Sequence, residues 1–336
     1  MSTPHMKTSD SVRVVVVTGA SAGVGRATVR EFAREKAYVG LIARDTEGLQ
    51  VAAREVNELG GKGLAVPADV ADAAQVEAAA ARIEEELGPI EVWVNNAMTT
   101  IFGRFADVSA DEYKRATEVT YLGTVYGTMA ALRYMLPRNS GRIIQVGSAL
   151  AYRSIPLQAA YCGAKHAIAG FTDSLRTELI HDNKNIHLTM VQLPAMNTPQ
   201  FTWCRSKMPH HPQPVPPIFQ PEVAAERIVW ASHHKRREIF VGAPTVVAIE
   251  ANKVAPALAD FYLGRTGFDS QQTTEDVSKN RADNLFEPVP GDFGAHGVFG
   301  HRAHKQAATT WLAQHKGLSA LAGAAAVGLV AFVFTK

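Results

Sequence analysis

One stretch near the N-terminus constrains the fold of this 336-residue chain more than any other. Residues Val12–Val17 form a short, β-branched, apolar run (Arg13 is its one charge) that is typical of a buried parallel strand. A glycine-rich turn, Thr18–Gly25, follows at once and leads into Arg26–Lys36, which has an apolar helical face. This order predicts a dinucleotide-binding unit, because glycines let the backbone approach a pyrophosphate and the helix N-terminus supplies amides; the alternative is a turn without a ligand. The expected contacts are Gly19, Ser21, Gly23, Val24 and Gly25.

The next predicted strand, Tyr38–Ala43, bears on which dinucleotide would bind. An acidic side chain at its end would accept a hydrogen bond from the ribose 2′-hydroxyl of NAD. Ala43 holds that place and Arg44 follows, so a 2′-phosphate would meet a guanidinium. The pattern therefore favours NADP(H) over NAD(H). The neighbouring Asp45 leaves NAD(H) open, and Arg44 could also be a solvated loop charge.

A second motif lies in the middle of the chain, where Ser148 ends the strand-like run Arg142–Gly147 and is followed by Tyr161 and Lys165. Residues spaced i and i+4 share one face of a helix, so Lys165 can hold its ammonium beside the phenol of Tyr161. A free tyrosine titrates near ~10, and a close cation lowers that pKa towards the range of a general acid or base. Ser148 would then hydrogen-bond a substrate oxygen while Tyr161 gives or takes its proton. The alternative is a chance Tyr-x-x-x-Lys pair on an exposed helix.

With these motifs in this order, the chain resembles the single-domain short-chain dehydrogenases/reductases from about Val12 to about Val241. The resemblance places Ser148, Tyr161 and Lys165 in the catalytic roles, and Lys165 also on the nicotinamide ribose. It further matches the family's Asn-Asn-Ala-Gly segment, in which Met98 replaces the glycine, and a segment after Pro194 that contacts the nicotinamide carboxamide. The cofactor contacts implied by the resemblance, besides Tyr161, Lys165 and the glycine turn, are Asp69, Asn95, Ala97 and Thr198.

Two positions depart from the family pattern. Thr120 stands where the family usually has an asparagine that helps to hold a proton-relaying water, so the relay is expected to be weaker or to use another water. Ala195 replaces the glycine that usually follows the proline, which should constrain the backbone only locally. Neither change removes a group that transfers the hydride or the first proton, and activity is expected to survive both.

Alternating strands and helices predict an α/β fold with a Rossmann-like, doubly wound parallel sheet. The expected division is a terminal segment 1–11, a dehydrogenase domain 12–252, an extension or linker 253–310 and an apolar terminal helix within 311–336. Further strands are expected at Gly63–Ala68, Glu91–Val94, Ile186–Leu193 and Glu238–Val241. Helices are expected at Glu47–Leu59, Ala73–Leu87, Ala110–Leu136, Ala159–His181, Pro221–His233 and about Ala251–Gly267.

Composition excludes several classes of function. A formal net charge of +2 and the absence of a basic block argue against a nucleic-acid surface. The two cysteines, Cys162 and Cys204, form no framework, and the histidines lack the spacing of a zinc site, so no metal is expected. A proline-rich stretch between Pro194 and Pro221 cannot be a continuous helix, and it is interpreted as a lid over a nonpolar substrate or, alternatively, a surface excursion or partner contact. The apolar residues of this lid are Phe201, Trp203, Met208 and Phe219.

The C-terminus carries eighteen uncharged residues, Gly317–Phe334, followed only by Thr335 and Lys336. At ~1.5 Å per residue this stretch just spans a bilayer core, and basic residues precede it. We therefore expect a cytoplasmic catalytic domain that is anchored to a membrane. The high alanine and glycine content keeps a buried or dimer-packing helix as the alternative.

The sequence as a whole predicts an NADP(H)-preferring oxidoreductase that interconverts an alcohol with a ketone or aldehyde. Its partner would be a small carbonyl or alcohol substrate of apolar character, and the chain is expected to form a homo-oligomer. A non-catalytic dinucleotide-binding or scaffold protein is the rival from another class. An epimerase or dehydratase is the rival among enzymes, although its usual glycine pattern and larger C-terminal domain are missing here.

Overall fold

The computed structural model describes residues 12–278 and 281–307. At its centre lies a seven-stranded sheet in the order β12-β7-β6-β4-β1-β2-β3, with every neighbouring pair parallel. From β1 the chain adds β2 and β3 on one side of the sheet, and it then returns past β1 to place β4, β6, β7 and β12 on the other side. This order confirms the predicted doubly wound Rossmann-like sheet. The strands are β1 (Val14–Thr18), β2 (Tyr38–Ala43), β3 (Lys62–Pro67), β4 (Ile90–Asn95), β6 (Gly141–Ser148), β7 (Ile186–Leu193) and β12 (Glu238–Phe240).

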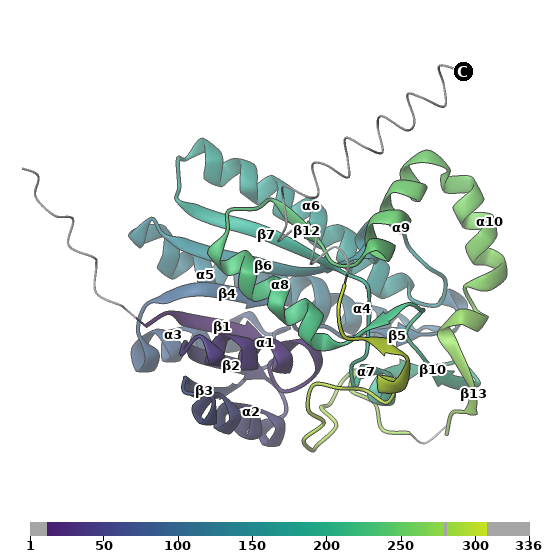
Figure 1. Cartoon of the computed structure of the whole chain (residues 1–336), viewed down its shortest axis with the longest axis horizontal. Helices are drawn as coiled ribbons and strands as arrows, with labels where there is room; N and C mark the ends of the chain where they lie inside the picture. The colour runs from purple at the N-terminus through teal and green to yellow at the C-terminus, as the bar shows by residue number, and fades with distance from the viewer. Residues whose placement is uncertain (1–11, 279–280, 308–336) are drawn as a thin grey trace, which may run out of the picture.

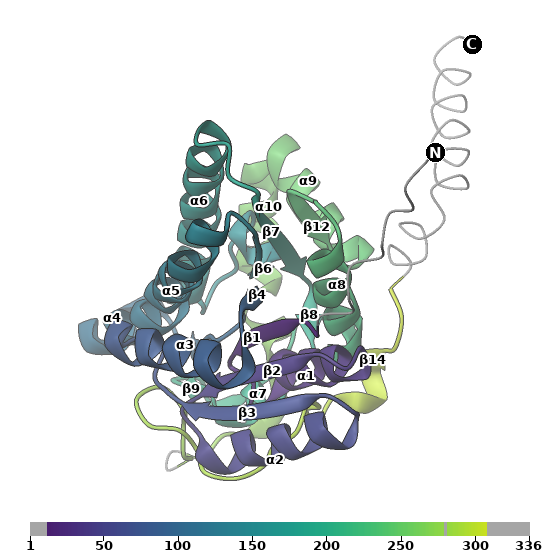
Figure 2. The same ribbon diagram turned by 90° about the vertical axis from the view of Figure 1, so that its left-hand side faces the viewer.

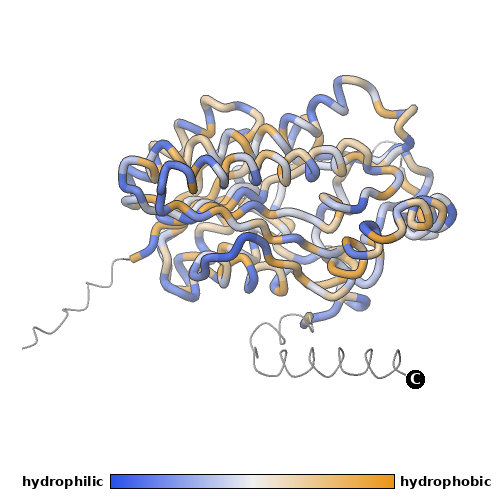
Figure 3. The backbone as a smooth tube through the Cα atoms, turned by 90° about the horizontal axis from the view of Figure 1, so that it is seen from above, coloured by the Kyte–Doolittle hydropathy of each residue, from blue (hydrophilic) through white to orange (hydrophobic). Residues whose placement is uncertain are grey.

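Helices cover both faces of the sheet (Figures 1 and 2). One face carries α1 (Gly23–Arg34), α2 (Thr46–Glu58) and α8 (Pro221–His233), and the other carries α3 (Ala73–Leu87), α5 (Gly123–Arg138) and α6 (Ala159–His181). Each layer buries its own apolar cluster against the strands. Figure 3 shows hydrophobic residues along the central strands and alternating polarity along the helices.

The helix predicted as continuous over Ala110–Leu136 is interrupted. It consists of α4 (Ala110–Thr117), a turn of π-helix at Glu118–Leu122 and then α5. Such single-turn bulges leave no signature in hydrophobic periodicity, because the apolar face continues across them. The turn contains the fully buried Thr120, whose hydroxyl accepts from the Thr99 amide (3.1 Å) and donates to the Thr99 carbonyl (2.9 Å).

The proline-rich segment between Pro194 and Pro221 folds into a short helix and several short strands rather than one irregular surface loop. Residues of this segment form α7 (Gln200–Trp203), and several two- or three-residue strands pair with distant parts of the chain. The short strands of this segment are β8 (Ala195–Met196), β9 (Arg205–Ser206), β10 (His210–Pro212) and β11 (Ile218–Phe219). They pair with one another or with β5 (Ile101–Phe102), the five-residue β13 (Gln272–Asp276) and β14 (Ala303–His304).

The chain beyond the sheet forms two helices, α9 (Ala243–Val254) and α10 (Pro256–Thr266), in place of the single helix predicted over 251–267. The break falls at Ala255, because the residue before a proline disfavours the helical conformation. Residues 281–307, here called the C-terminal arm, pack against the dehydrogenase domain. Leu285 is fully buried, and Phe299 and Ala307 are 6% and 3% exposed, so this part of the predicted linker belongs to the folded body.

Two predicted segments fall outside the described residues: the N-terminal stretch 1–11 and the apolar segment Gly317–Phe334. Within residues 12–278 and 281–307, no helix combines the length and the apolar character needed to cross a bilayer.

Candidate active site

A large cavity of about 690 Å³ opens at the carboxyl ends of the sheet strands. This is where ligands of open α/β sheets bind, and the volume suits a ligand-sized pocket. The cavity runs from the glycine turn and the end of β2 to the end of β6 and the start of α6. Of the sequence-predicted residues it gathers Gly19, Ser21, Gly23, Val24, Arg44, Asp69, Ala97, Ser148, Tyr161, Lys165 and Thr198.

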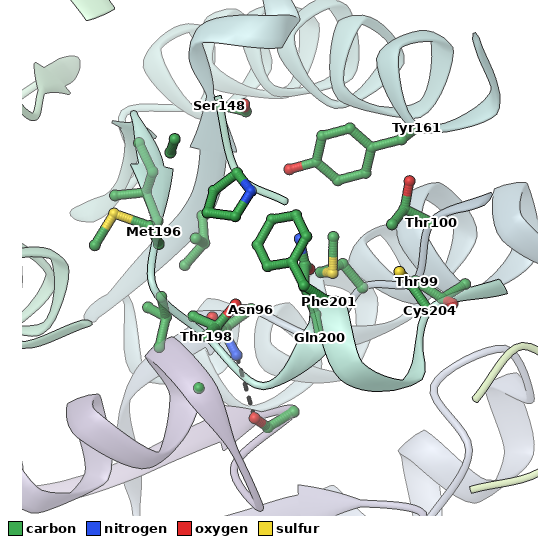
Figure 4. Close-up of a pocket in the computed structure, with 18 of the residues that line it drawn as sticks. Asn96, Thr99, Thr100, Ser148, Tyr161, Met196, Thr198, Gln200, Phe201 and Cys204 are labelled. Atoms are coloured by element: carbon green, nitrogen blue, oxygen red, sulfur yellow. Dashed lines mark hydrogen bonds between the residues drawn. The ribbon is translucent and has the colours of Figure 1, made fainter. Parts of the chain in front are cut away.

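The three predicted catalytic residues meet at this pocket. Ser148 ends β6, and Tyr161 and Lys165 lie one turn apart on α6. The Tyr161 hydroxyl points into the pocket on the side where Ser148 lies (Figure 4). The Lys165 ammonium lies 5.4 Å from the centroid of the Tyr161 ring and donates to the Val146 carbonyl at 2.7 Å. Strand end and helix turn therefore bring together an acid, its hydroxyl partner and a buried cation.

Burial has the largest effect on the pKa values of Tyr161 and Lys165. It raises the pKa of Tyr161, while the hydrogen bond with Ser148 lowers it by a smaller amount. Burial also lowers the pKa of Lys165 to about 8. The spacing of Tyr161 and Lys165 predicted that the ammonium lowers the pKa of Tyr161, but in the structure this pKa is raised. The reason is that the ammonium is aimed at the Val146 carbonyl, and desolvation of the phenolate outweighs the remaining stabilisation.

A hydrogen-bonded chain behind Ser148 was not predicted. The Ser148 amide donates to Oε1 of the fully buried Gln192 at 2.7 Å, and Gln192 Nε2 donates to Glu238 Oε1 at 2.6 Å. The Tyr152 hydroxyl donates to the same oxygen of Glu238 at 2.5 Å. A buried glutamine among the apolar residues of β7 was the one available signal, since buried polar groups are kept only where they are paired.

The glycine turn has the tight geometry that a pyrophosphate site requires. Gly19 has a φ of +65°, and a Cβ on Gly25 would meet the Gly19 carbonyl oxygen at 2.0 Å. Gly25 therefore shapes the turn from behind and does not line the cavity, in contrast to the expected direct contact. Asn96 holds the turn in place, because its side-chain amide donates to the Thr18 carbonyl (2.9 Å) and the Gly19 carbonyl (3.3 Å) (Figure 4).

Asn95 was expected at the cofactor, but it lies beneath the pocket in the core. Its side chain accepts from Trp93 Nε1 (2.8 Å) and donates to Thr128 (3.0 Å) and Gln145 (2.9 Å). The residue is 3% exposed and is absent from the cavity wall. Side chains alternate along a strand and its extension, so the neighbouring Asn96 takes the pocket-facing position.

At the other end of the glycine turn, Arg44 and Asp69 form a charged wall that includes the C-terminal arm. Arg44 donates to the carbonyls of Phe286 (2.6 Å) and Asn284 (2.5 Å). Asp69 accepts from Arg115 at 2.5 Å. Burial lowers the pKa of Arg44, and Asp69 opposes that shift. Arg44 and Asp69, the two residues expected to contact the adenosine, thus both line the cavity, and each is held by a partner.

The arm closes over this part of the pocket. The Gly23 amide, at the N-terminus of α1, donates to the Gly294 carbonyl at 3.0 Å. Phe293 packs edge-on against Trp203 with ring centroids 4.4 Å apart. Both rings line the cavity, together with the arm residues Asn284, Pro288, Val289 and Gly291. This cover could not be predicted from the sequence, because the arm has neither periodicity nor a motif.

The remaining walls are mainly apolar. Of the predicted lid residues, Phe201 and Trp203 line the cavity, whereas Met208 and Phe219 do not line it and pack in the neighbouring hydrophobic clusters. Val215, Pro216 and Pro217 complete the lid side. The polar exceptions near Tyr161 include Thr100 and Gln158, which are hydrogen-bonded to each other at 3.2 Å.

These features fit a nicotinamide dinucleotide. The glycine cradle, Val24 at the N-terminus of α1, and the Arg44–Asp69 wall lie along one continuous cavity that ends at Ser148 and Tyr161. Among the described residues, no cluster of three or more histidine, cysteine or acidic side chains could hold a metal ion. Both cysteines are buried and unpaired.

Comparison with known proteins agrees with this architecture. The family model described as short chain dehydrogenase matches residues 13–208. The uncharacterized oxidoreductase YxnA of Bacillus subtilis is 31% identical over 279 residues, which cover 82% of this chain and 78% of YxnA. The ketoacyl reductase HetN of a Nostoc species is 33% identical over 81% of this chain and 93% of its own length. A 3-dehydrosphinganine reductase of Danio rerio is 36% identical over 56% of this chain and 57% of its own.

Solved structures give the same fold. The alcohol dehydrogenase of the archaeon Thermococcus sibiricus, complexed with 5-hydroxy-NADP, superposes with a TM-score of 0.59 at 25% identity, covering 69% of this chain and 96% of that protein. The matched family model spans more than half of the 336 residues and includes the glycine turn, Ser148, Tyr161 and Lys165. The chain belongs to the short-chain dehydrogenase/reductase family of oxidoreductases.

Proposed function

We propose that the protein is an NADP(H)-preferring oxidoreductase that interconverts an alcohol with a ketone or aldehyde, with Tyr161 as the acid/base. The observation that carries this proposal is the convergence of Ser148, Tyr161 and Lys165 at the end of one cavity whose other end is the glycine turn. An intact set of this kind argues against a non-catalytic scaffold, because binding a dinucleotide alone does not require a paired acid and hydroxyl. When bound, the dinucleotide supplies or accepts the hydride.

Side chains of this protein supply the proton that the carbonyl oxygen takes up during reduction. Burial raises the pKa of Tyr161, so the phenol is protonated at neutral pH and can donate to a carbonyl oxygen. Ser148 holds that oxygen by a hydrogen bond, and its own position is fixed through the Gln192 side chain. Lys165 brings a positive charge to the phenolate that donation leaves behind. The geometry thus supports carbonyl reduction, and the same groups in reverse support alcohol oxidation.

The preference for NADP(H) is supported by the wall at the end of β2. Ala43 leaves no acidic group there, and Arg44 lines the cavity. Its two hydrogen bonds to arm carbonyls use two of the five donors of a guanidinium, which leaves donors for a 2′-phosphate. The bonds also hold the guanidinium plane in a fixed orientation.

The test is a screen of aldehydes and ketones with purified protein and NADPH, followed by the variant Tyr161→Phe on any substrate found. This change keeps the ring and its packing but deletes the transferred proton. Turnover should fall by at least ~100-fold, the effect of losing a positioned acid, while NADPH still binds. Near-normal turnover of the variant would remove Tyr161 from its role. NADPH binding without turnover of any carbonyl would instead favour the scaffold.

A further inference from the structure

Helix α10 is held away from the hydrophobic core. None of its eleven residues is buried. Leu258, Phe261 and Tyr262 follow one another at i, i+3 and i+4 and are 68%, 57% and 62% exposed. An isolated helix of this length is marginal in water, and helices in proteins are stabilised by packing an apolar face. A helix that turns three large apolar side chains to solvent is therefore expected to have a partner for them.

The adjoining helix α9 extends the same apolar surface. Its Val247 is 65% exposed and Val254, at its end, is 85% exposed. Figure 1 shows α9 and α10 side by side, projecting beyond the carboxyl ends of the sheet strands. We call Val247, Val254, Leu258, Phe261 and Tyr262 the α9–α10 apolar surface.

Polar contacts fix the orientation of this helix pair. Arg153, which follows β6, donates to Asn252 of α9 at 3.0 Å and to Asp260 of α10 at 2.6 Å. Asn252 in turn donates to the Tyr152 carbonyl at 2.8 Å. The polar side of the pair is thereby fastened to the catalytic domain, and the apolar side is left facing outwards.

The α9–α10 apolar surface is continuous with the pocket. Val247 and Tyr262 line the cavity even though most of each side chain is exposed, so they form the rim of its mouth. Leu263 and Ala248 continue the wall inwards from that rim. An apolar molecule that contacts the outer surface can therefore move into the pocket without crossing a polar barrier at this rim.

We propose that the α9–α10 apolar surface rests in the interface of a phospholipid bilayer, from which apolar substrate enters the pocket. A rigid protein seated on Val247 and Tyr262 would cover the mouth, whereas fluid acyl chains leave it open and themselves hold apolar solutes. The pair carries Glu250, Lys253, Asp260 and Arg265 and so has no net formal charge. Binding should accordingly depend on apolar contact and occur on zwitterionic lipid. Only the substrate-entry step rests on the proposed function; docking does not.

Because both native cysteines are buried, a single exposed cysteine can be labelled with an environment-sensitive fluorophore in the full-length chain. Phe261→Cys places the label on α10. Ile180→Cys is the matched control, since Ile180 is 68% exposed on α6. With phosphatidylcholine vesicles, the label at 261 should shift to the blue, at least double in intensity and be quenched by spin-labelled lipid. The label at 180 should change little, even if another segment also tethers the chain to the vesicle.

Three results would overturn the proposal. One is the absence of a vesicle response at 261, and another is an equal response at 261 and 180. The third is a label at 261 that is already shielded without lipid. Shielding that grows with protein concentration would assign the surface to a second copy of the chain, and shielding independent of concentration would assign it to another segment of the same chain.

Substrate entry has its own test in the double variant Leu258→Glu/Phe261→Glu, whose two positions lie outside the cavity wall. With a long-chain carbonyl dissolved in vesicles, kcat/KM should fall about tenfold, while a short water-soluble carbonyl should be reduced as by the wild type. An equal effect on both substrates would contradict entry from lipid. If neither protein reduces any carbonyl, the proposed function fails, and the fluorescence result still decides docking.

Discussion

The side chain of Lys165 is only 3% exposed, so its ammonium is largely shielded from water. This burial lowers the pKa of Lys165 from 10.5 to about 8. Since the unfolded chain binds this proton more tightly than the native state does, the native state carries a penalty at neutral pH. The penalty shrinks as pH rises from about 8 towards 10.5. The free energy of unfolding of wild type should therefore rise relative to that of Lys165→Met over this window, by on the order of 2 kcal/mol.

Urea unfolding of both proteins at pH 7.5 and 10 measures this difference. Lys114→Met is the control, because Lys114 is 73% exposed on α4 and should show no comparable change. Parallel pH profiles for wild type and Lys165→Met would mean that the ammonium of Lys165 is not destabilised by its surroundings.

Gln192 should act on catalysis through Ser148. Gln192→Leu leaves the buried Ser148 amide without its acceptor, at a cost of ~1–3 kcal/mol, and removes one of the two donors to Glu238, the other being the Tyr152 hydroxyl. We expect kcat to fall by about 10- to 100-fold through misplacement of Ser148, with the dissociation constant for NADPH almost unchanged. Tyr152→Phe removes only the outermost hydrogen bond of the chain and should have a smaller effect. Equal losses in kcat and in NADPH affinity would indicate general disruption of the sheet end rather than positioning of Ser148.

At the scale of elements, β2 and the C-terminal arm form one cofactor wall, and Arg44 joins them. Arg44→Ala should weaken NADPH much more than NADH, because only NADPH carries the 2′-phosphate. The loss of charge-assisted bonds worth ~1.5–3 kcal/mol corresponds to about a ten- to hundredfold change in the dissociation constant. The variant should also expose residues 284–289 to limited proteolysis. The dissociation constants of NADPH and NADH for the variant and the wild type test this prediction. Equal weakening of both cofactors would mean that Arg44 only holds the arm in place.

The sequence predicted best those elements whose burial follows a regular period. The bounds expected for β2, β7, α3, α6 and α8 coincide with those observed, because each presents an uninterrupted apolar face or run to the sheet. The π-turn between α4 and α5 was missed since it changes backbone hydrogen bonding without changing that face. The packing of the arm was missed because several of its contacts are made by backbone carbonyls, such as those of Asn284 and Gly294, which have no side-chain signature.

In the candidate site, too, the residues that belong to a sequence pattern were predicted and the others were not. Ser148, Tyr161 and Lys165 were predicted because their roles depend on side chains at fixed spacing, and the fold brings all three to one pocket. Asn95 does not line the cavity whereas Asn96 does, and the motif could not indicate which of the two neighbouring asparagines faces the pocket. The Gln192–Glu238 chain joins β7 to β12, and only the folded sheet brings these side chains together.

For the whole molecule, the open question is how the described body relates to the apolar segment Gly317–Phe334. The described part of the chain ends at Ala307, which is 3% exposed and packs in the same hydrophobic cluster as residues of α1 and α8. Truncation after His315 therefore retains every described contact and should give a soluble, folded and active protein. The full chain should fractionate with membranes and resist extraction by salt, because an uncharged stretch of eighteen residues is long enough to span a bilayer.

Truncation after Ser278 provides the contrast. It removes the arm, and with it the buried Leu285 and Phe299, the partner of the Gly23 amide and both acceptors of Arg44. This shorter chain should unfold at a lower temperature and bind NADPH weakly, because the pocket loses one wall and the core loses buried apolar side chains. Thermal unfolding and NADPH titration of the two truncations thus separate the arm from the terminal segment. If the chain cut after His315 unfolds like the shorter one, or if the full-length protein is soluble without detergent, the terminal segment packs on protein and the anchor prediction is wrong.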